Sequence, residues 1–353
     1  MGNRRPSLQD SEGPAGLPTR AYQALQTWPA HNLTHDLWQE ILAFLPLEDQ
    51  TRLAHTSHPM QDIVEQLAPQ ALDPAAHNAP GFIRTIYTQT ELNTSLNTGQ
   101  WVDFIPGTDS DLTIGRGLAH VHGPGTLASV TDDGFVTALD DPHITTVTGG
   151  TVHAYGQASI TTVTDGNVYA YEQTSIEDVT GGHITPVGQA TIATVTGGTV
   201  HAHDQATITT VTGGNVSTVS HARITTVTGG KVRAGENAAV TRVTGGDLYA
   251  AGQSTISEVS GGAILTTSQS TIGDVSGGTV TAAENAVVTV VGGDAHIIAR
   301  GNTHVTIEAS AGGVHVDAND AAHITAHSGT VTIHSPDVTV TSKSDSNAVI
   351  NHA

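Results

Sequence analysis

Residues 190–205 read ATIATVTGGTVHAHDQ, and residues 206–221 repeat the pattern as ATITTVTGGNVSTVSH. The pattern keeps a step of 16 residues in three aliphatic columns, and a turn with one or two glycines separates the second column from the third. Ten repeats in one register indicate a solenoid, in which each unit buries its apolar side chains against the next unit. The first column consists of Ile144, Ile160, Ile176, Ile192, Ile208, Ile224, Val240, Ile256, Ile272 and Val288.

Each 16-residue unit contains two short apolar stretches and two turns. This predicts a mainly β fold, a parallel β-helix or solenoid with two strands in each coil, preceded by a small α-helical module. Side chains alternate between the two faces of a strand, so every second residue is expected to point into the core. In one unit this alternation predicts an inward set of Ala158, Ile160, Thr162, Gly166, Val168 and Ala170.

The repeat begins near residue 112 and becomes irregular after Val291, where the register slips by one residue. Apolar alternation continues to Val340, so the solenoid is predicted to span residues 112–341. The slip places His304 and His323 about one coil apart, which predicts that they lie side by side. The other predicted segments are a disordered tail at 1–27, a helical module at 28–68, a connector and cap at 69–111, and a frayed tail at 342–353.

An apolar helical stripe of Leu37, Trp38, Ile41, Leu42 and Leu45 ends at Pro46, and a second helix is predicted to start at Ser57. Residues 33–64 resemble an F-box, with departures at Thr34, Gln50 and Met60. The resemblance implies a partner, the helical adaptor of a cullin-type ubiquitin ligase. A small helical bundle packed on the solenoid is the alternative. By the resemblance, the adaptor-binding residues would be Leu33, Leu37, Ile41, Leu42, Leu45 and Pro46.

The composition narrows the classes of partner and of chemistry. A formal net charge of −21 with 12 Lys and Arg disfavours nucleic acid and anionic membranes as partners. The chain has no cysteine, which excludes disulfides and thiol catalysis. No apolar run is long enough to span a membrane, and residues 1–19 lack the apolar core of a secretory signal. A cytoplasmic location is therefore expected.

Acid–base catalysis needs clustered carboxylates, and the outward columns consist mainly of Thr, Ser, Asn and Gln. The nearest candidate is Glu258 beside Asp274, with Asp178 in the same column, and it is interpreted as a solvated acidic edge. No catalytic residue, metal site or cofactor is predicted. The 20 histidines are expected to be scattered over the surface, because His304 and His323 lack a third ligand.

The outward Thr and Ser residues support a second hypothesis. A regular array of hydroxyl and methyl groups is similar to the flat face of ice-binding solenoids, although Ala193, Arg223, Ala239 and Gly273 interrupt it. The leading hypothesis is a non-enzymatic adaptor whose solenoid displays a surface to an unknown target protein. A structural or ice-binding rod is the alternative, and a surface fibre is the third. The possible flat-face binding residues are Ser159, Thr161, Thr207, Thr209, Thr225 and Thr255.

Overall fold

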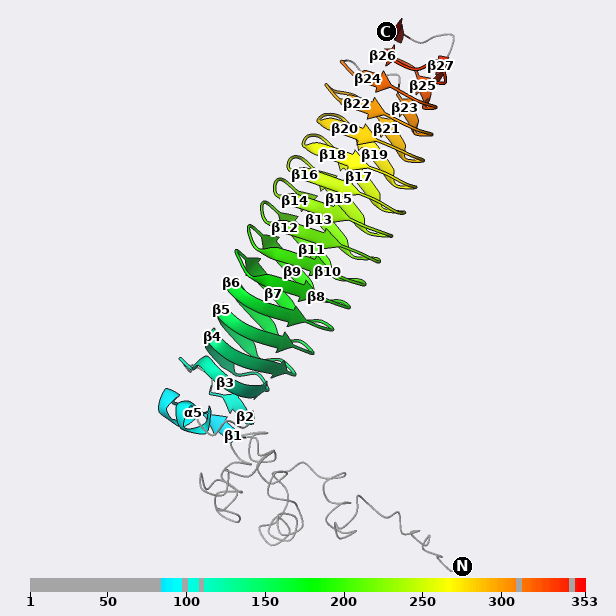
Figure 1. The fold of residues 1–353 in the computed structure, drawn as a ribbon. Coiled ribbons are helices and arrows are strands. Elements are labelled where there is room, and N and C mark those ends of the chain that lie inside the picture. Colours follow the sequence, from blue (N-terminus) through cyan, green and yellow to red (C-terminus); the bar gives the residue numbers. More distant parts are fainter. Residues whose placement is uncertain (1–83, 97–100, 108–110, 309–312, 343–346) are drawn as a thin grey trace, which may run out of the picture.

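In a computed structural model, the described part of the chain forms a long parallel β-solenoid (Figure 1). Successive coils lie directly on one another, so that Ile208 pairs with Ile192 on one side and with Ile224 on the other. The predicted solenoid of 16-residue coils is therefore confirmed. The F-box-like segment, with Leu33 to Pro46 as its predicted contact residues, lies outside the described residues. The structure describes residues 84–96, 101–107, 111–308, 313–342 and 347–353.

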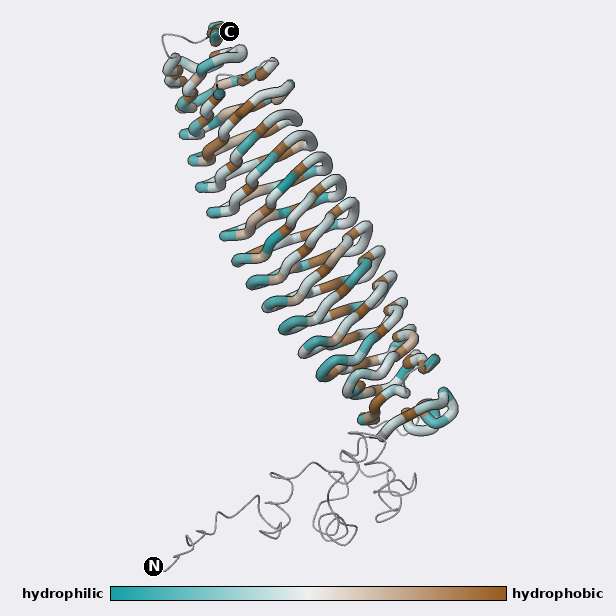
Figure 2. The backbone as a smooth tube through the Cα atoms, turned by 180° about the vertical axis from the view of Figure 1, so that it is seen from behind, coloured by the Kyte–Doolittle hydropathy of each residue, from teal (hydrophilic) through white to brown (hydrophobic). Residues whose placement is uncertain are grey.

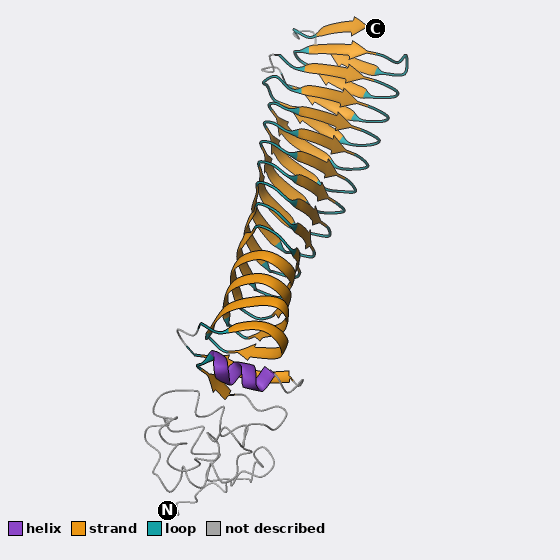
Figure 3. Ribbon diagram, turned by 60° about the vertical axis from the view of Figure 1, so that its left-hand side comes forward, coloured by secondary structure: helices purple, strands orange, loops and turns teal. Residues whose placement is uncertain are grey.

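In the first coils a single long strand makes up most of each coil. In the later coils two short strands take its place (Figure 3). The long strands are β3 Thr113–His122, β4 Thr126–Leu139, β5 His143–Ala154 and β6 Ser159–Ala170. The first strands of the later coils are β7 Ser175–Val179, β9 Thr191–Val195, β11 Thr207–Val211, β13 Arg223–Val227, β15 Ala239–Val243, β17 Thr255–Val259, β19 Thr271–Val275, β21 Val287–Val290, β23 His304–Ile307, β25 His323–Ala326 and β27 Thr339–Ser342. The second strands are β8 His183–Pro186, β10 Thr199–Ala202, β12 Asn215–Thr218, β14 Lys231–Ala234, β16 Asp247–Ala250, β18 Ala263–Thr266, β20 Thr279–Ala282, β22 His296–Ala299, β24 His315–Ala318, β26 Thr330–Ile333 and β28 Val349–His352.

Five inward positions in each regular 16-residue coil build the core, and hydrophobic residues recur at the same places in coil after coil (Figure 2). In the coil of β6 they are Ala158, Ile160, Val163, Val168 and Ala170. The predicted inward position of Thr162 is wrong. Two residues, rather than one, face outward between the Ile and Val columns, because burial of the valine is favoured over strict alternation of the strand.

The glycine turn closes each coil where backbones of adjacent coils come into contact. Gly166, predicted to point inward, instead lies at this turn with a φ of +91°, a conformation that side chains with a Cβ rarely adopt. A Cβ at this position would lie 2.7 Å from the backbone carbonyl group of Gly149. Glycine is therefore required by the stacking of the coils as well as by the turn.

A helix and two short strands lie at the N-terminal end of the stack. Strand β1 (Arg84–Ile86) pairs with β2 (Trp101–Pro106), and β2 pairs with the second half of β3. Helix α5 (Gln89–Leu96) buries Leu92 and Leu96 in the core cluster. It is the single helix among the described residues. With eight residues it is too short to cross a membrane, and no other helix in the described part of the chain could do so.

The C-terminal coils vary in length but keep the parallel pairing. His304 pairs with His323 at a step of 19 residues, and their rings stack with centroids 4.9 Å apart, which confirms the predicted neighbourhood. Within the predicted frayed tail at 342–353, strand β28 pairs in parallel with β26, and its side chains are exposed.

Candidate functional site

The solenoid exposes two different faces. The first-strand face consists of the outward residues of the first half of each coil, such as Ser159 and Thr161. The second-strand face consists of the outward residues of the second half, such as Asn167 and Tyr169. Since the core columns are nearly uniform, the chemical differences between coils lie on these faces. The second-strand face carries stacked aromatic rings, two His–Asp clusters and a shallow groove.

Stacked rings cover the second-strand face at its N-terminal end. His153 lies between Phe135 and Tyr169, with ring centroids 5.3 and 4.7 Å away, and Tyr155 stacks on Tyr171 at 4.7 Å. Trp101 meets Phe135 edge to face and stacks on His120 at 4.2 Å. Parallel pairing places equivalent residues of successive coils at stacking distance. We define the aromatic ladder as Trp101, His120, Phe135, His153, Tyr155, Tyr169 and Tyr171.

Packing within the ladder favours the neutral forms of two of its rings, those of His153 and Tyr171. Burial lowers the pKa of His153, because an imidazolium would lose hydration between the two rings. Burial, together with the charges that Tyr155 and Tyr169 would carry, raises the pKa of Tyr171. The neutral forms of His153 and Tyr171 are therefore favoured in the middle of the ladder.

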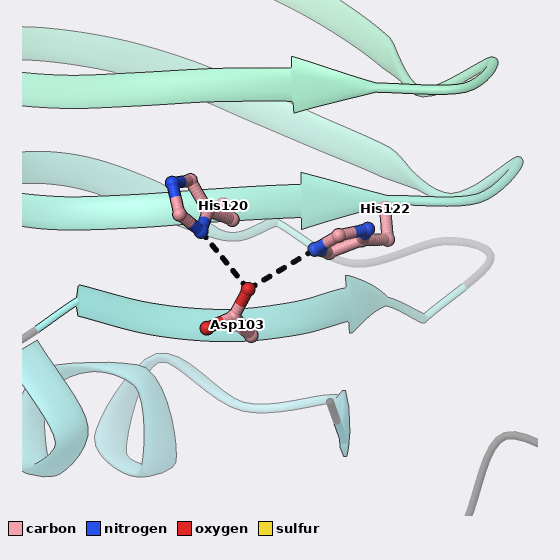
Figure 4. A group of neighbouring side chains, drawn as sticks. All are labelled: Asp103, His120 and His122. Atoms are coloured by element: carbon pink, nitrogen blue, oxygen red, sulfur yellow. Dashed lines mark hydrogen bonds and ion pairs between the residues drawn. The ribbon is translucent and has the colours of Figure 1, made fainter. Parts of the chain in front are cut away.

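Three side chains converge at the start of the ladder (Figure 4). Asp103 lies on β2, and the register of the pair places it opposite His120 on β3, with His122 two residues further on the same face. Oδ1 of Asp103 lies 2.9 Å from Nδ1 of His120 and 3.2 Å from Nε2 of His122. The nitrogen and oxygen atoms of this group lie within 4.8 Å of one another, so together they could hold a metal ion.

A second cluster forms around Asp317 on the same face near the C-terminal end. Its carboxylate lies 2.9 Å from His296, 3.1 Å from His315 and 3.4 Å from His334. Burial tends to raise the pKa of Asp317, but hydrogen bonds from His296 and His334 and the charges of His315 and His296 outweigh it and lower the pKa. These histidines are 39–46% exposed, so this cluster is open to solvent.

A shallow groove of about 450 Å³ lies on the second-strand face between the two clusters. Its lining includes Lys231, Arg233, Tyr249 and Leu265, and the guanidinium of Arg233 lies 5.5 Å from the ring centre of Tyr249. Leu265 is an exposed large hydrophobic residue on this surface. The groove joins apolar groups with charged groups of both signs, since Asp247 also lines it, in contrast to the aromatic ladder.

The six predicted flat-face residues all point outward on the first-strand face. Thr209 and Thr225 lie on adjacent strands, β11 and β13, and Ser159 and Thr161 both hydrogen-bond to His143. Thr207 and Thr255 lie on β11 and β17. The array is interrupted by charged residues: Arg223 pairs directly with Thr207.

The predicted acidic edge is also on the first-strand side. Glu258 pairs with Asp274 in the ladder of strands β17 and β19, so the expected neighbourhood is confirmed. Glu258 makes an ion pair of 2.6 Å with Arg242, and both side chains are about half exposed. This carboxylate is therefore engaged by a cation in a solvated setting.

Sequence reasoning missed both His–Asp clusters, because it treated the histidines as scattered. The motif His120-Val121-His122 was a usable signal, since alternate residues of a strand share a face. Asp103 could not be added from the repeat, because it precedes the regular coils. His315-Val316-Asp317 is a similar motif, but the coils around it have unequal lengths.

Comparison with family models, with curated proteins and with solved structures finds no match for this chain. The resemblance of residues 33–64 to the F-box therefore has no matching family model. Function must be argued from the geometry of the faces.

Proposed function

We propose that this chain is a non-enzymatic protein-interaction adaptor whose solenoid binds a target protein through the aromatic ladder. The observation that carries the proposal is the concentration of rings on one face. Only 4% of the residues are Phe, Trp or Tyr, yet Trp101, Phe135, Tyr155, Tyr169 and Tyr171 lie together on neighbouring coils. Aromatic residues are enriched at protein interfaces, where rigid rings supply large contact areas.

Charge around the ladder favours a basic partner segment. Arg116 is the only Lys or Arg between residues 101 and 180. Exposed carboxylates lie on the same coils as the ladder, at Asp132 and Asp133 within β4 and at Asp140, Asp141 and Glu172 between strands. Lys or Arg side chains of a partner would stack on the rings and pair with these carboxylates. A target protein with a basic segment therefore fits this surface best.

A photo-crosslinking experiment with the full chain tests the surface. A benzoyl-phenylalanine at position 169 should capture a target protein in extracts of the native host, and the same group at Thr209 on the first-strand face should not. The purified target should then bind Tyr155→Ser/Tyr169→Ser at least tenfold more weakly, because such anchors contribute about 2 kcal/mol or more each. Equal capture at both positions, or unchanged affinity of the double variant, would refute the proposal.

The proposed role of the F-box-like head rests on its resemblance alone. In this proposal residues 33–64 recruit the cullin-linked helical adaptor while the solenoid holds the target. Full-length chain should bind the purified adaptor, and Leu37→Asp/Ile41→Asp should lose that binding while the target still binds. Adaptor binding that survives the double substitution would remove the head from the proposal.

The alternative of an ice-binding rod has one supporting observation, the outward threonines Thr209 and Thr225 on adjacent strands. The charged Arg223 and the engagement of Ser159 and Thr161 by His143 break the regular array that such a surface requires. The adaptor function is therefore preferred.

A further inference from the structure

We infer that Asp103, His120 and His122 form a binding site for one divalent transition-metal ion of the zinc type. The inference is independent of the proposed adaptor function, because it rests on the donor atoms alone. The three side chains come from two paired strands, so the backbone ladder fixes where each one starts (Figure 4). A ring nitrogen of each histidine approaches Oδ1 of Asp103, and the three donor atoms lie within 4.8 Å of one another.

The spacing of the donor atoms suits a zinc ion. Zn–N and Zn–O bonds of about 2.0–2.2 Å at tetrahedral angles place neighbouring ligand atoms roughly 3.3–3.6 Å apart. Oδ1 of Asp103 is 2.9 Å from Nδ1 of His120 and 3.2 Å from Nε2 of His122. These two distances would widen by a few tenths of an ångström to admit the ion in place of the hydrogen-bonded protons. The two histidine nitrogens, which lie within 4.8 Å of each other, would adjust to the same tetrahedral spacing. A fourth position would be left for water or for a group of a partner.

Packing holds the ligands in place before an ion binds. The ring of His120 stacks on Trp101 with an interplanar angle of 21°, which restricts its rotation. The side chains of Asp103 and His122 are 15% and 17% exposed, so little water competes for them. Pre-ordered ligands raise affinity, because less conformational entropy is lost on binding.

The donor set also selects among ions. Two imidazoles and one carboxylate suit Zn²⁺, Co²⁺, Ni²⁺ or Cu²⁺, whereas Mg²⁺ and Ca²⁺ prefer oxygen ligands alone. The cluster at Asp317 offers similar donors, but its histidines are 39–46% exposed, compared with 31% and 17% for His120 and His122. The site at Asp103 is therefore the better ordered one, and a test must separate it from the Asp317 cluster.

Trp101 provides a local reporter for this test. The full chain would carry Trp28→Phe and Trp38→Phe, so that Trp101 is its single tryptophan, and Asp317→Asn, which removes the centre of the other cluster. Co²⁺ is titrated while tryptophan fluorescence is recorded. We expect saturable quenching that Zn²⁺ reverses and that excess Mg²⁺ or Ca²⁺ leaves unchanged, because Co²⁺ at His120 lies next to the stacked indole.

Substitution of the ligands then assigns the signal. His122→Asn, which leaves the stack of His120 on Trp101 intact, should weaken Co²⁺ and Zn²⁺ binding by about 100-fold or more, since loss of outer-shell partners alone weakens metal binding 10–100-fold. His201→Asn on the same face is the matched control and should bind like the parent. Far-ultraviolet circular dichroism checks that each variant is folded. Quenching without saturation, or equal affinities of the parent and folded His122→Asn, would overturn the inference.

Discussion

Ser254 provides a quantitative test of how the inward columns of the solenoid tolerate polar atoms. It occupies the inward position at the start of its coil, where Ala238 and Ala286 stand in equivalent coils. The residue is 1% exposed, and within the described residues its Oγ makes no hydrogen bond. We therefore expect Ser254→Ala to stabilise the protein, because alanine keeps the Cβ and removes the unpaired hydroxyl.

The neighbouring coil supplies the control. Ser270 lies in the same column, and its Oγ donates a hydrogen bond to the carbonyl oxygen of Thr267 at 2.6 Å and also contacts the hydroxyl of Thr266. Removal of Ser270 Oγ would leave the Thr266 hydroxyl without this partner. The two substitutions are chemically the same, so their difference isolates the hydrogen bonds.

The magnitudes follow from burial. A buried hydroxyl without a partner costs about 1–3 kcal/mol in protein series, so Ser254→Ala should raise stability by roughly 1 kcal/mol or more. Ser270→Ala should lower it by about 1–3 kcal/mol, because a buried polar group loses its partner. For a unit of this size, 1 kcal/mol corresponds to roughly 2–4 °C in Tm.

Thermal unfolding followed by circular dichroism measures both changes against the parent chain. The result that would refute the reasoning is a loss of stability in Ser254→Ala comparable with that in Ser270→Ala. Thr174 and Ser270 donate to the carbonyl oxygen three residues earlier. Such a loss would mean that Ser254 donates to Ala251 in the same way.

Three further predictions concern the turns, the ladder and the threonines. Gly198→Ala should destabilise the solenoid by about 1–3 kcal/mol, since its φ is +73° and a Cβ would lie 2.7 Å from the backbone of Gly181. Gly235→Ala is the control: its Cβ would lie 3.6 Å from the nearest atom, so its stability in the same melting assay should be within about 1 kcal/mol of the parent. The pKa of His153 is lower in the folded state, so the unfolded state binds more protons and stability should fall as pH drops below about 6.5. Melting curves of His153→Gln should show a smaller fall with pH, and an equal fall would contradict the role given to His153. The purified chain should leave ice-crystal growth unchanged, and Thr209→Lys/Thr225→Lys should keep its target affinity; ice shaping that this variant loses would favour the alternative function.

The sequence predicts the architecture well, because residues 16 positions apart are also the residues that pair between the strands of adjacent coils. The columns of Ile208 and Val211 are buried as far as Val288 and Val275, as their 16-residue step indicates. The register slip, predicted after Val291, instead lies inside β21, where a single outward residue separates the two buried valines. Val290 there pairs with Val275 and is buried, whereas Val291 is only half-buried. The inward position of Thr162 was predicted wrongly, because a two-fold alternation takes no account of the extra outward residue between two buried columns. Local geometry of this kind depends on contacts with the coils above and below.

The candidate site was harder to predict, because it lies where the repeat is least regular. Asp103 belongs to β2, which precedes the regular coils, and its pairing with His120 follows a step of 17 residues. The contacts of the Trp101 ring with His120 and Phe135 likewise join residues whose spacing differs from the repeat. Neighbours at such positions become visible only when the strand register is known.

The inward and outward residues of the coils therefore differ in how far they must repeat. The inward columns must match from coil to coil, since each aliphatic side chain packs against its equivalent in the next coil. The outward columns carry no such constraint, so polar, aromatic and ligand-forming residues can differ in each coil. On the second-strand face those differences gather into the aromatic ladder and the Asp103 cluster at one end and the Asp317 cluster near the other. Binding chemistry in this protein is therefore expected where the outer residues depart from the repeat.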